Sequence, residues 1–185
     1  HLNVYWTTVS PMDDYGYMTT GLGCVYDREY MEAADIVIVE VNENLPRLMG
    51  DAFIHIREVD YVVEHTAPLL EIPGIELGEK EKNIGKYIAE LVEDESTIQL
   101  GIGGIPNAVG LELFDKRDLG VHTEMFTDSM VDLYEAGVIT NRKKTYMPGR
   151  MTACFAAGTK KLYNFLDNNH AAYFLQGKVS NDEFT

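Results

Sequence analysis

The chain has 185 residues, of which 45% are hydrophobic, and carries a formal net charge of −15 at pH 7. This length and apolar content are enough to bury a core, in one domain or in two small ones. The acidic balance argues against general nucleic-acid binding, because a phosphate backbone needs a basic surface. No apolar run approaches the roughly 20 residues of a membrane-spanning helix, so we expect a soluble, cytoplasmic protein without nucleic-acid or membrane partners.

Charge is unevenly distributed along the chain. Residues 1–100 hold 20 acidic and 6 basic side chains, a net charge of −14, whereas residues 101–185 hold 10 and 9, a net charge of −1. The second part can therefore tolerate a small anionic ligand. Cys24 and Cys154 lie in apolar surroundings, which favours buried free thiols over a disulfide, and no C-x-x-C spacing predicts a metal site.

The first third of the chain alternates strand and helix patterns. The expected elements are a strand at 1–10, a turn at 11–18, a helix at 28–34 and strands at 36–42, 52–56 and 61–66. The strand IVIVEVN is a continuous apolar run, which predicts burial on both faces of a parallel sheet. Asp13 and Asp14 in the turn are expected to stabilise it, or alternatively to line a ligand pocket.

Residues 67–80 carry prolines, glycines and charges without a clear period, which predicts a linker. A helix at 82–94 and a buried strand at 96–102 follow it. The helix places its apolar side chains on one face, which we expect to lie in the core, namely Ile84, Tyr87, Ile88, Leu91 and Val92.

The rest of the chain continues the alternation. We expect helices at 107–115 and 128–137, a strand at 121–127, and a strand followed by an amphipathic helix within 152–168. Asp128 or Ser129 is expected to cap the second of these helices, with Gly137 past its end. The whole pattern predicts an α/β fold with mostly parallel sheets and flanking helices, whose ligands gather at the carboxyl ends of the strands.

The stretch GIGGIP, residues 101–106, stands at such a strand end. Gly101, Gly103 and Gly104 permit positive φ and close approach of another group, and Pro106 suits the first turn of a helix. Free N–H groups at a helix N-terminus can hold a phosphate, a carboxylate or an oxyanion. The spacing matches neither the dinucleotide fingerprint nor the P-loop, so a structural turn and a ligand site both stay open.

Two further candidates lie in VHTEM. Glu124 lies at a predicted strand end beside the glycine loop. Its carboxylate is an orienting acid, a general acid or base, a hydrogen-bonded structural group or, less favoured, a nucleophile. His122 lies two residues before Glu124, so both side chains point to the same side of that strand. A lone histidine in such a place is more often a structural group than an acid or base partner.

Four segments resemble the acetyl-CoA hydrolase and CoA-transferase family, in its 4-hydroxybutyrate, butyrate and acetate CoA-transferase branch. They are VSPMDDYGYMTTG, AADIVIVEVNENLPRLMGDAFIHI, IGKYIAELVEDESTIQLGIGGIPNAV and GVHTEMFTDSMVDLYEAGVITNRKKTYMPGR. The resemblance implies a CoA-transferase (NagB/RpiA-like) architecture with parts of two domains. Residues 1–66 would be the C-terminal part of the first domain, 67–80 the linker, and 81–185 the N-terminal part of the second, so that the chain is a fragment.

The resemblance also implies an activity. Such enzymes move CoA from a short-chain acyl-CoA to a free carboxylate such as acetate, with the CoA thioester as substrate and without a metal or prosthetic group. A glutamate carboxylate becomes a glutamyl-CoA thioester through an anhydride. The family loop implies CoA and oxyanion binding by Gly101, Gly103, Gly104, Ile105, Pro106 and Asn107, and the full-length family implies a homo-oligomer.

One position departs from the family pattern. In NNHAAYFLQGKVSND, residues 168–182, the outer Asn-Asn and Asn-Asp pairs match, but Tyr173 stands where the nucleophilic glutamate is expected and His170 replaces a proline. A phenol cannot form the anhydride and thioester that a carboxylate forms. An acetyl-CoA hydrolase, a catalytically inactive CoA-binding fragment, and a sugar-phosphate isomerase-like domain therefore remain alternatives to CoA transfer.

Overall fold

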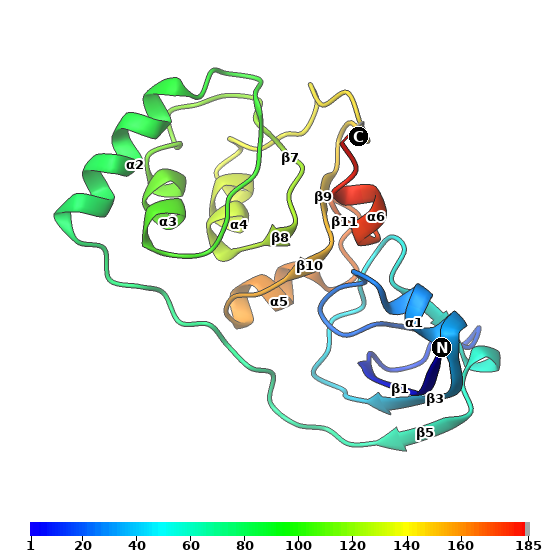
Figure 1. Ribbon diagram of the computed structural model, residues 1–185. Coiled ribbons are helices and arrows are strands. Elements are labelled where there is room, and N and C mark those ends of the chain that lie inside the picture. Colours follow the sequence, from blue (N-terminus) through cyan, green and yellow to red (C-terminus); the bar gives the residue numbers. More distant parts are fainter. Residues whose placement is uncertain (184–185) are drawn as a thin grey trace.

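The computed structural model describes residues 1–183 and confirms the α/β fold with parallel strand pairing (Figure 1). The elements up to residue 64 are β1 (Leu2–Val9), β2 (Tyr17–Thr19), α1 (Asp27–Ala33), β3 (Ala34–Val41), β4 (Phe53–His55), a 3-10 turn (Ile56–Glu58) and β5 (Tyr61–Glu64). The following elements are α2 (Glu79–Leu91), β6 (Thr97–Ile98), α3 (Gly104–Leu111), β7 (Gly120–Val121), β8 (Met125–Phe126), α4 (Asp128–Glu135), β9 (Met151–Ala153), β10 (Phe155–Ala156), α5 (Lys160–Leu166), β11 (Ala172–Phe174) and α6 (Gly177–Ser180).

The first half builds a three-stranded parallel sheet in the order β1-β3-β5. One face of this sheet buries Val9, Val37 and Val39 against Met18 of β2, Met31 of α1 and their neighbours. The opposite face carries side chains such as Trp6, which is 61% exposed. The expectation that β3 is buried on both faces is therefore wrong, because only its alternate residues meet a covering layer.

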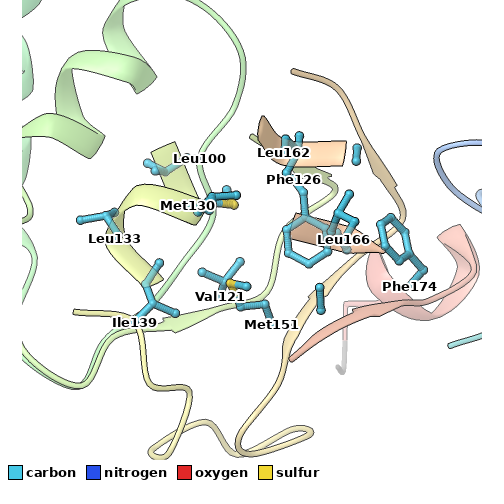
Figure 2. Close-up of a cluster of buried hydrophobic side chains, with 14 of the residues drawn as sticks. Leu100, Val121, Phe126, Met130, Leu133, Ile139, Met151, Leu162, Leu166 and Phe174 are labelled. Atoms are coloured by element: carbon cyan, nitrogen blue, oxygen red, sulfur yellow. The ribbon is translucent and has the colours of Figure 1, made fainter. Parts of the chain in front are cut away.

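The second half places short parallel strands side by side. β6 pairs with β7, β8 with β10, and β9 with β11, while a bridge between His122 and Thr152 joins the end of β7 to β9. α4 and α5 cover one side of these strands, and the core lies between them (Figure 2). Phe126 and Phe174 meet there edge to face, with ring centroids 5.3 Å apart.

The two halves share that core. Cys24, Leu48 and Ala52 from the first half are buried among the side chains of the second. Gly50 bridges Phe174, and a Cβ on Gly50 would lie 2.1 Å from the Phe174 carbonyl oxygen, so the close approach requires a glycine. Residues 65–78 form an extended connection without helix or strand between β5 and α2 (Figure 1). The division into two domains at residues 67–80 stays a prediction.

Several local expectations are corrected. Four of the five apolar side chains expected in the core at α2 are exposed, with Tyr87 at 67% and Leu91 at 82%, whereas Val92 packs against the core as expected. The buried side of the helix is formed by the small residues Gly85 and Ala89. The residue preceding α4 is Thr127, whereas the Asp128 carboxylate accepts hydrogen bonds from Thr159.

The expected strand at 121–127 is interrupted between β7 and β8, and the sequence patterns did not predict β11 or α6. Cys24 and Cys154 are free and buried, as expected. Within residues 1–183, no helix has the length and apolar character needed to cross a bilayer.

Candidate functional site

The glycine loop connects β6 to α3. Gly103 adopts φ +119° and ψ 179°, a backbone conformation that essentially only glycine can take. It is the residue immediately before α3. A Cβ added to Gly101 would touch only the Pro106 ring, at 3.9 Å, so packing does not demand a glycine there. The loop therefore leaves open space above its backbone.

This loop presents unpaired donors. No side chain caps α3, and within the described chain the N–H groups of Gly104 and Ile105 have no acceptor. Asn107, whose N–H bonds to the Gly103 carbonyl at 3.2 Å, closes the first turn, and Pro106 has no N–H to satisfy. Free N–H groups at a helix N-terminus favour an anionic ligand or a developing oxyanion.

Parallel pairing brings the other candidate positions into one row. The His122 N–H donates to the carbonyl of Ile98 at the end of β6, His122 bridges Thr152, and Thr152 is the register partner of Tyr173. Residues opposite each other in neighbouring strands present their side chains on the same face. His122, Thr152 and Tyr173 therefore share the face of the sheet that looks away from the core.

Tyr173 contacts a cation. The Arg150 guanidinium carbon lies 5.0 Å from the centroid of the Tyr173 ring, which is within range of a cation–π interaction. Tyr173 is half-buried, whereas its neighbours Ala172 and Phe174 are fully buried. Tyr173, where the resemblance led us to expect a glutamate, thus presents its ring to the guanidinium of Arg150.

A buried lysine lies beside this row. Lys144 is 6% exposed, and its Nζ donates to the Val121 carbonyl at 2.7 Å, to the Arg150 carbonyl at 2.7 Å and to Thr152 Oγ1 at 3.1 Å. Burial lowers the pKa of Lys144 to about 8. Within the described residues no carboxylate forms an ion pair with Lys144, so this face of the sheet carries uncompensated positive charge.

Both ring nitrogens of His122 have a hydrogen-bond partner. Its Nδ1 lies 3.0 Å from Thr152 Oγ1 and its Nε2 lies 2.8 Å from the Ser180 carbonyl oxygen. Since Lys144 already donates to Thr152, the hydroxyl proton of Thr152 is free to bond Nδ1, which leaves Nε2–H to donate to Ser180. These contacts match the structural interpretation of His122.

Glu124 lies at the interruption between β7 and β8. Its side chain is exposed, and its carbonyl accepts from the N–H groups of Cys154 and Phe155. No hydrogen bond within residues 1–183 joins its carboxylate to Tyr173 or to the glycine loop. The structure therefore places Glu124 at the same sheet edge as the loop without joining their polar groups.

A cavity of about 790 Å³ lies between α5 and the carboxyl ends of β1, β3 and β5. Asp13 and Arg47, an ion pair with an N–O distance of 2.6 Å, line it, and Asp14 does not. The N–H groups of Tyr17 and Tyr15 and the Arg47 guanidinium lower the pKa of Asp13. Asp13 thus stabilises the turn, as expected, and also faces the cavity.

Sequence reasoning did not find the grouping of Lys144, Arg150 and Thr152. Arg150 and Thr152 are near neighbours in sequence, but the residues form no recognisable motif, because the fold of the preceding loop brings Lys144 to them. The signal present in the sequence is a basic run at 142–150 that precedes a strand, within an acidic chain. No set of three or more potential metal-ligating side chains is clustered in the part of the chain that the structure describes.

Comparison with known proteins gives the same class of fold and places the chain in a family. Residues 2–72 match the acetyl-CoA hydrolase/transferase N-terminal domain. The chain is 50% identical, over 161 residues, to 4-hydroxybutyrate coenzyme A transferase of Clostridium kluyveri, covering 87% of this chain and 38% of that protein. It is 41% identical to butyryl-CoA:acetate CoA-transferase of Anaerostipes caccae, covering 98% of this chain and 42% of that protein.

A solved structure is also similar. The 4-hydroxybutyrate CoA-transferase of Porphyromonas gingivalis superposes with a TM-score of 0.91 at 38% identity, covering 97% of this chain and 46% of that one. Fold and loop define an α/β protein with an uncapped helix start at its sheet edge. The chain belongs to the acetyl-CoA hydrolase/transferase family. It spans about two fifths of the length of the curated relatives that it matches.

Proposed function

We propose that this protein acts in CoA transfer between a short-chain acyl-CoA, of the acetyl, butyryl or 4-hydroxybutyryl type, and a free carboxylate such as acetate. The observation that carries the proposal is the glycine loop, which ends in an uncapped helix with free N–H groups in a chain of this family. The CoA thioester is the substrate, and the chemistry calls for no prosthetic group.

The loop has a defined role in this proposal. The N–H groups of Gly104 and Ile105 are donors for the oxyanion that develops when a thioester carbonyl is attacked. Gly103 sets the backbone turn, and the open space above Gly101 admits the ligand. Pro106 and Asn107 form the first turn of the helix that supports these donors.

The resemblance assigns the covalent step to a carboxylate at position 173, and Glu124 is the other carboxylate that we consider for it. In the family pattern a glutamate attacks the thioester carbonyl carbon, CoA leaves as thiolate, and an acyl anhydride forms. The thiolate then attacks the glutamyl carbonyl and releases the acyl group as a free carboxylate. Tyr173 cannot carry out this sequence, because its phenolic oxygen cannot become the carbonyl of a thioester.

Tyr173, at the position where the resemblance implies a glutamate, favours a second candidate, which is acyl-CoA binding without turnover. Hydrolysis of acetyl-CoA is the variant in which water replaces the acceptor acid, and exposed Glu124 is the acidic side chain proposed to orient or activate that water. We also propose a cytoplasmic location. A homo-oligomer remains the expectation for the full-length family.

Intact-mass spectrometry after incubation with butyryl-CoA tests the proposal. A mass gain of CoA less water on the wild-type chain supports CoA transfer through another carboxylate, for which Glu124 is the candidate. If residue 173 instead blocks the covalent step, only the Tyr173→Glu variant gains this mass. Tyr173→Phe serves as the matched control, since it keeps the ring and lacks any nucleophile. Equilibrium dialysis with CoA measures binding in all three proteins.

The outcomes separate the candidates. An adduct on Tyr173→Glu alone supports a transferase scaffold in which residue 173 blocks turnover. CoA binding without an adduct on any variant leaves only the binding function. Absence of CoA binding by all three proteins would overturn both.

A further inference from the structure

The carboxylate of Glu124 is free although the backbone that carries it is fixed. The Glu124 side chain is exposed, and within residues 1–183 its carboxylate forms no ion pair and no hydrogen bond to protein. The Glu124 carbonyl accepts from the N–H groups of Cys154, at 2.9 Å, and Phe155, at 3.2 Å. The Thr123 N–H donates to the Thr152 carbonyl at 3.0 Å. The chain therefore holds the base of this side chain and leaves its acidic end open to a ligand.

Ser180, the last residue of α6, contacts both residues that precede Glu124. The Ser180 hydroxyl donates to the Thr123 carbonyl at 3.1 Å, and the Ser180 carbonyl accepts from His122 Nε2 at 2.8 Å. A carbonyl oxygen can only accept, so His122 Nε2 carries a proton, and Nδ1 of the neutral ring accepts from the Thr152 hydroxyl at 3.0 Å. Ser180 is 6% exposed, so little water competes for these bonds. One buried serine thus bonds two consecutive residues.

α6 is itself anchored to the first half of the chain. The Gly177 N–H donates to the Val25 carbonyl at 2.8 Å, and Lys178 forms an ion pair with Glu29 at 2.9 Å. A Cβ on Gly177 would lie 3.0 Å from Val25 Cγ1, so the helix packs closely against this part of the chain. Ser180 therefore connects the residues before Glu124 to a helix that other contacts hold in place.

The segment that carries Glu124 needs such contacts. It lies between β7 and β8, where the regular strand pairing that fixes side-chain direction is interrupted. A reacting group that is displaced by about 1 Å can lose about 100-fold in rate. Because the Glu124 carboxylate has no partner of its own in the described chain, its direction depends on the backbone of residues 122–124.

We propose that Ser180 is a positioning residue, which together with His122 fixes the segment 122–124 and so sets the direction of the Glu124 carboxylate. The inference rests on the proposed function, in which Glu124 is one of two carboxylates considered for the covalent step. Ser180 acts through the Thr123 carbonyl and the His122 ring, and it supplies no group to the substrate.

The rate of CoA adduct formation tests this role. The full chain is mixed with increasing concentrations of butyryl-CoA, quenched at short times and weighed intact, and peptide mapping locates the adduct. Ser180→Ala should lower the limiting rate by about tenfold or more. The half-saturating butyryl-CoA concentration should stay unchanged, because the glycine loop supplies the proposed CoA contacts. Ser180→Thr keeps the hydroxyl and should restore the limiting rate, whereas His122→Phe should lower it like Ser180→Ala.

Ser10→Ala is the matched control. Ser10 is 1% exposed, and its hydroxyl accepts from the Thr19 N–H at 2.9 Å, so this variant also loses a buried serine contact. A general loss of stability reduces the fraction of protein that reacts and leaves the limiting rate unchanged. We therefore expect Ser10→Ala to keep the wild-type limiting rate.

Amide hydrogen exchange, followed by NMR, gives a readout that does not need the reaction. The Thr123 and Cys154 N–H groups donate to the Thr152 and Glu124 carbonyls, and both should exchange about tenfold faster in Ser180→Ala than in the wild type. The amides of β3, in the sheet of the first half, should exchange alike in the two proteins.

An unchanged limiting rate in Ser180→Ala would overturn the inference, and so would unchanged exchange at Thr123 and Cys154. An equal loss of rate in Ser10→Ala, or an adduct on a residue other than Glu124, would overturn it as well. If the wild type formed no adduct, the covalent route through Glu124 would fail, and the exchange rates alone would decide whether Ser180 fixes the segment. The failure of this inference and the failure of the proposed function are therefore distinguishable.

Discussion

At the scale of single residues, Lys144 is buried and its ammonium makes three hydrogen bonds. Its aliphatic side chain packs directly against Gly120, where an added Cβ would lie 2.4 Å from the lysine Cγ. The absence of a side chain at residue 120 therefore makes room for the lysine. Three acceptors surround the ammonium, and they satisfy all three of its N–H donors. A buried charge without a counter-ion is stable only with such complete hydrogen bonding.

This burial predicts a specific pH dependence of stability. Because the pKa of Lys144 falls from 10.5 to about 8 on folding, the unfolded chain binds more protons than the folded protein between these values. The free energy of unfolding therefore gains a component that increases with pH over this window. Relative to Lys144→Met, the wild type should gain roughly 2 kcal/mol between pH 7.5 and 9.5.

Urea unfolding of both proteins across this pH range measures the difference. Lys143→Met is the control, since Lys143 is exposed and pairs with Glu95 at the surface. That variant should follow the wild-type pH dependence. If the unfolding free energies of the wild type and Lys144→Met changed in parallel with pH, the lowered pKa of Lys144 in the folded protein would be contradicted.

At the scale of elements, the packing of α2 against α3 fixes where the glycine loop lies. The contact is close because Gly85 of α2 faces Ala108 of α3, where an added Cβ would lie 2.7 Å from the Ala108 carbonyl carbon. Small residues at this crossing let the two helix backbones approach each other. The N-terminus of α3, and with it the free N–H groups, is positioned by this contact.

Gly85→Ala should therefore destabilise the protein although alanine is the better helix former. The propensity gain of about 1 kcal/mol is opposed by overpacking against backbone, which costs about 1–3 kcal/mol. We expect a net loss or at best no gain in the free energy of unfolding, together with weaker CoA binding. Asn83→Ala, an exposed position on the same helix, is the control and should be neutral or slightly stabilising.

Urea denaturation and CoA dialysis of both variants check this prediction. A clear stabilisation by Gly85→Ala without loss of CoA binding would contradict the assigned role of the contact. A loss of CoA binding by Asn83→Ala would show that the effect does not arise from the helix crossing.

The sequence predicted most elements of the fold because local periodicity and turn residues determine them. β1, β3 and α4 follow from β-branched runs and apolar spacing, and Gly137 has the positive φ expected after a helix. The buried face of α2 could not be predicted, because the pattern marks its large apolar residues and the contact uses its small ones. β11 could not be recognised from three residues, since its stability comes from pairing with β9.

Only the part of the candidate site that lies within one continuous segment could be predicted from the sequence. The glycine loop is local, and its geometry follows from Gly103 and the helix that it begins. The group formed by Arg150, Thr152 and Tyr173 depends on the register of two strands, and a single sequence does not contain that register. Tyr173 could be singled out by the family pattern, but its arginine partner could not.

At the scale of the whole molecule, the sheet of the first half has one bare apolar face. Val4, Trp6, Tyr61 and Val63 point outward from β1 and β5 and are between 43% and 61% exposed. Parallel sheets ordinarily carry helices on both faces, because each face is apolar. Within residues 1–183, the edge of β5 that points away from β3 has no strand partner, and the corresponding edge of β1 is paired only at its end, by the bridge from Val9 to Thr20.

This face should cause concentration-dependent self-association, since exposed apolar patches and open strand edges both favour pairing. Trp6 is the single tryptophan of the chain and therefore reports on the face directly. As protein concentration rises, we expect an increase in the sedimentation coefficient and a shift of the Trp6 emission to shorter wavelength. The Val4→Lys/Val63→Lys variant keeps Trp6 and should remain monomeric with emission typical of an exposed indole.

Tyr15→Lys, at an 82% exposed position outside the sheet, is the control and should associate like the wild type. A wild-type protein that stays monomeric, with Trp6 emission independent of concentration, would show that the bare face does not drive association.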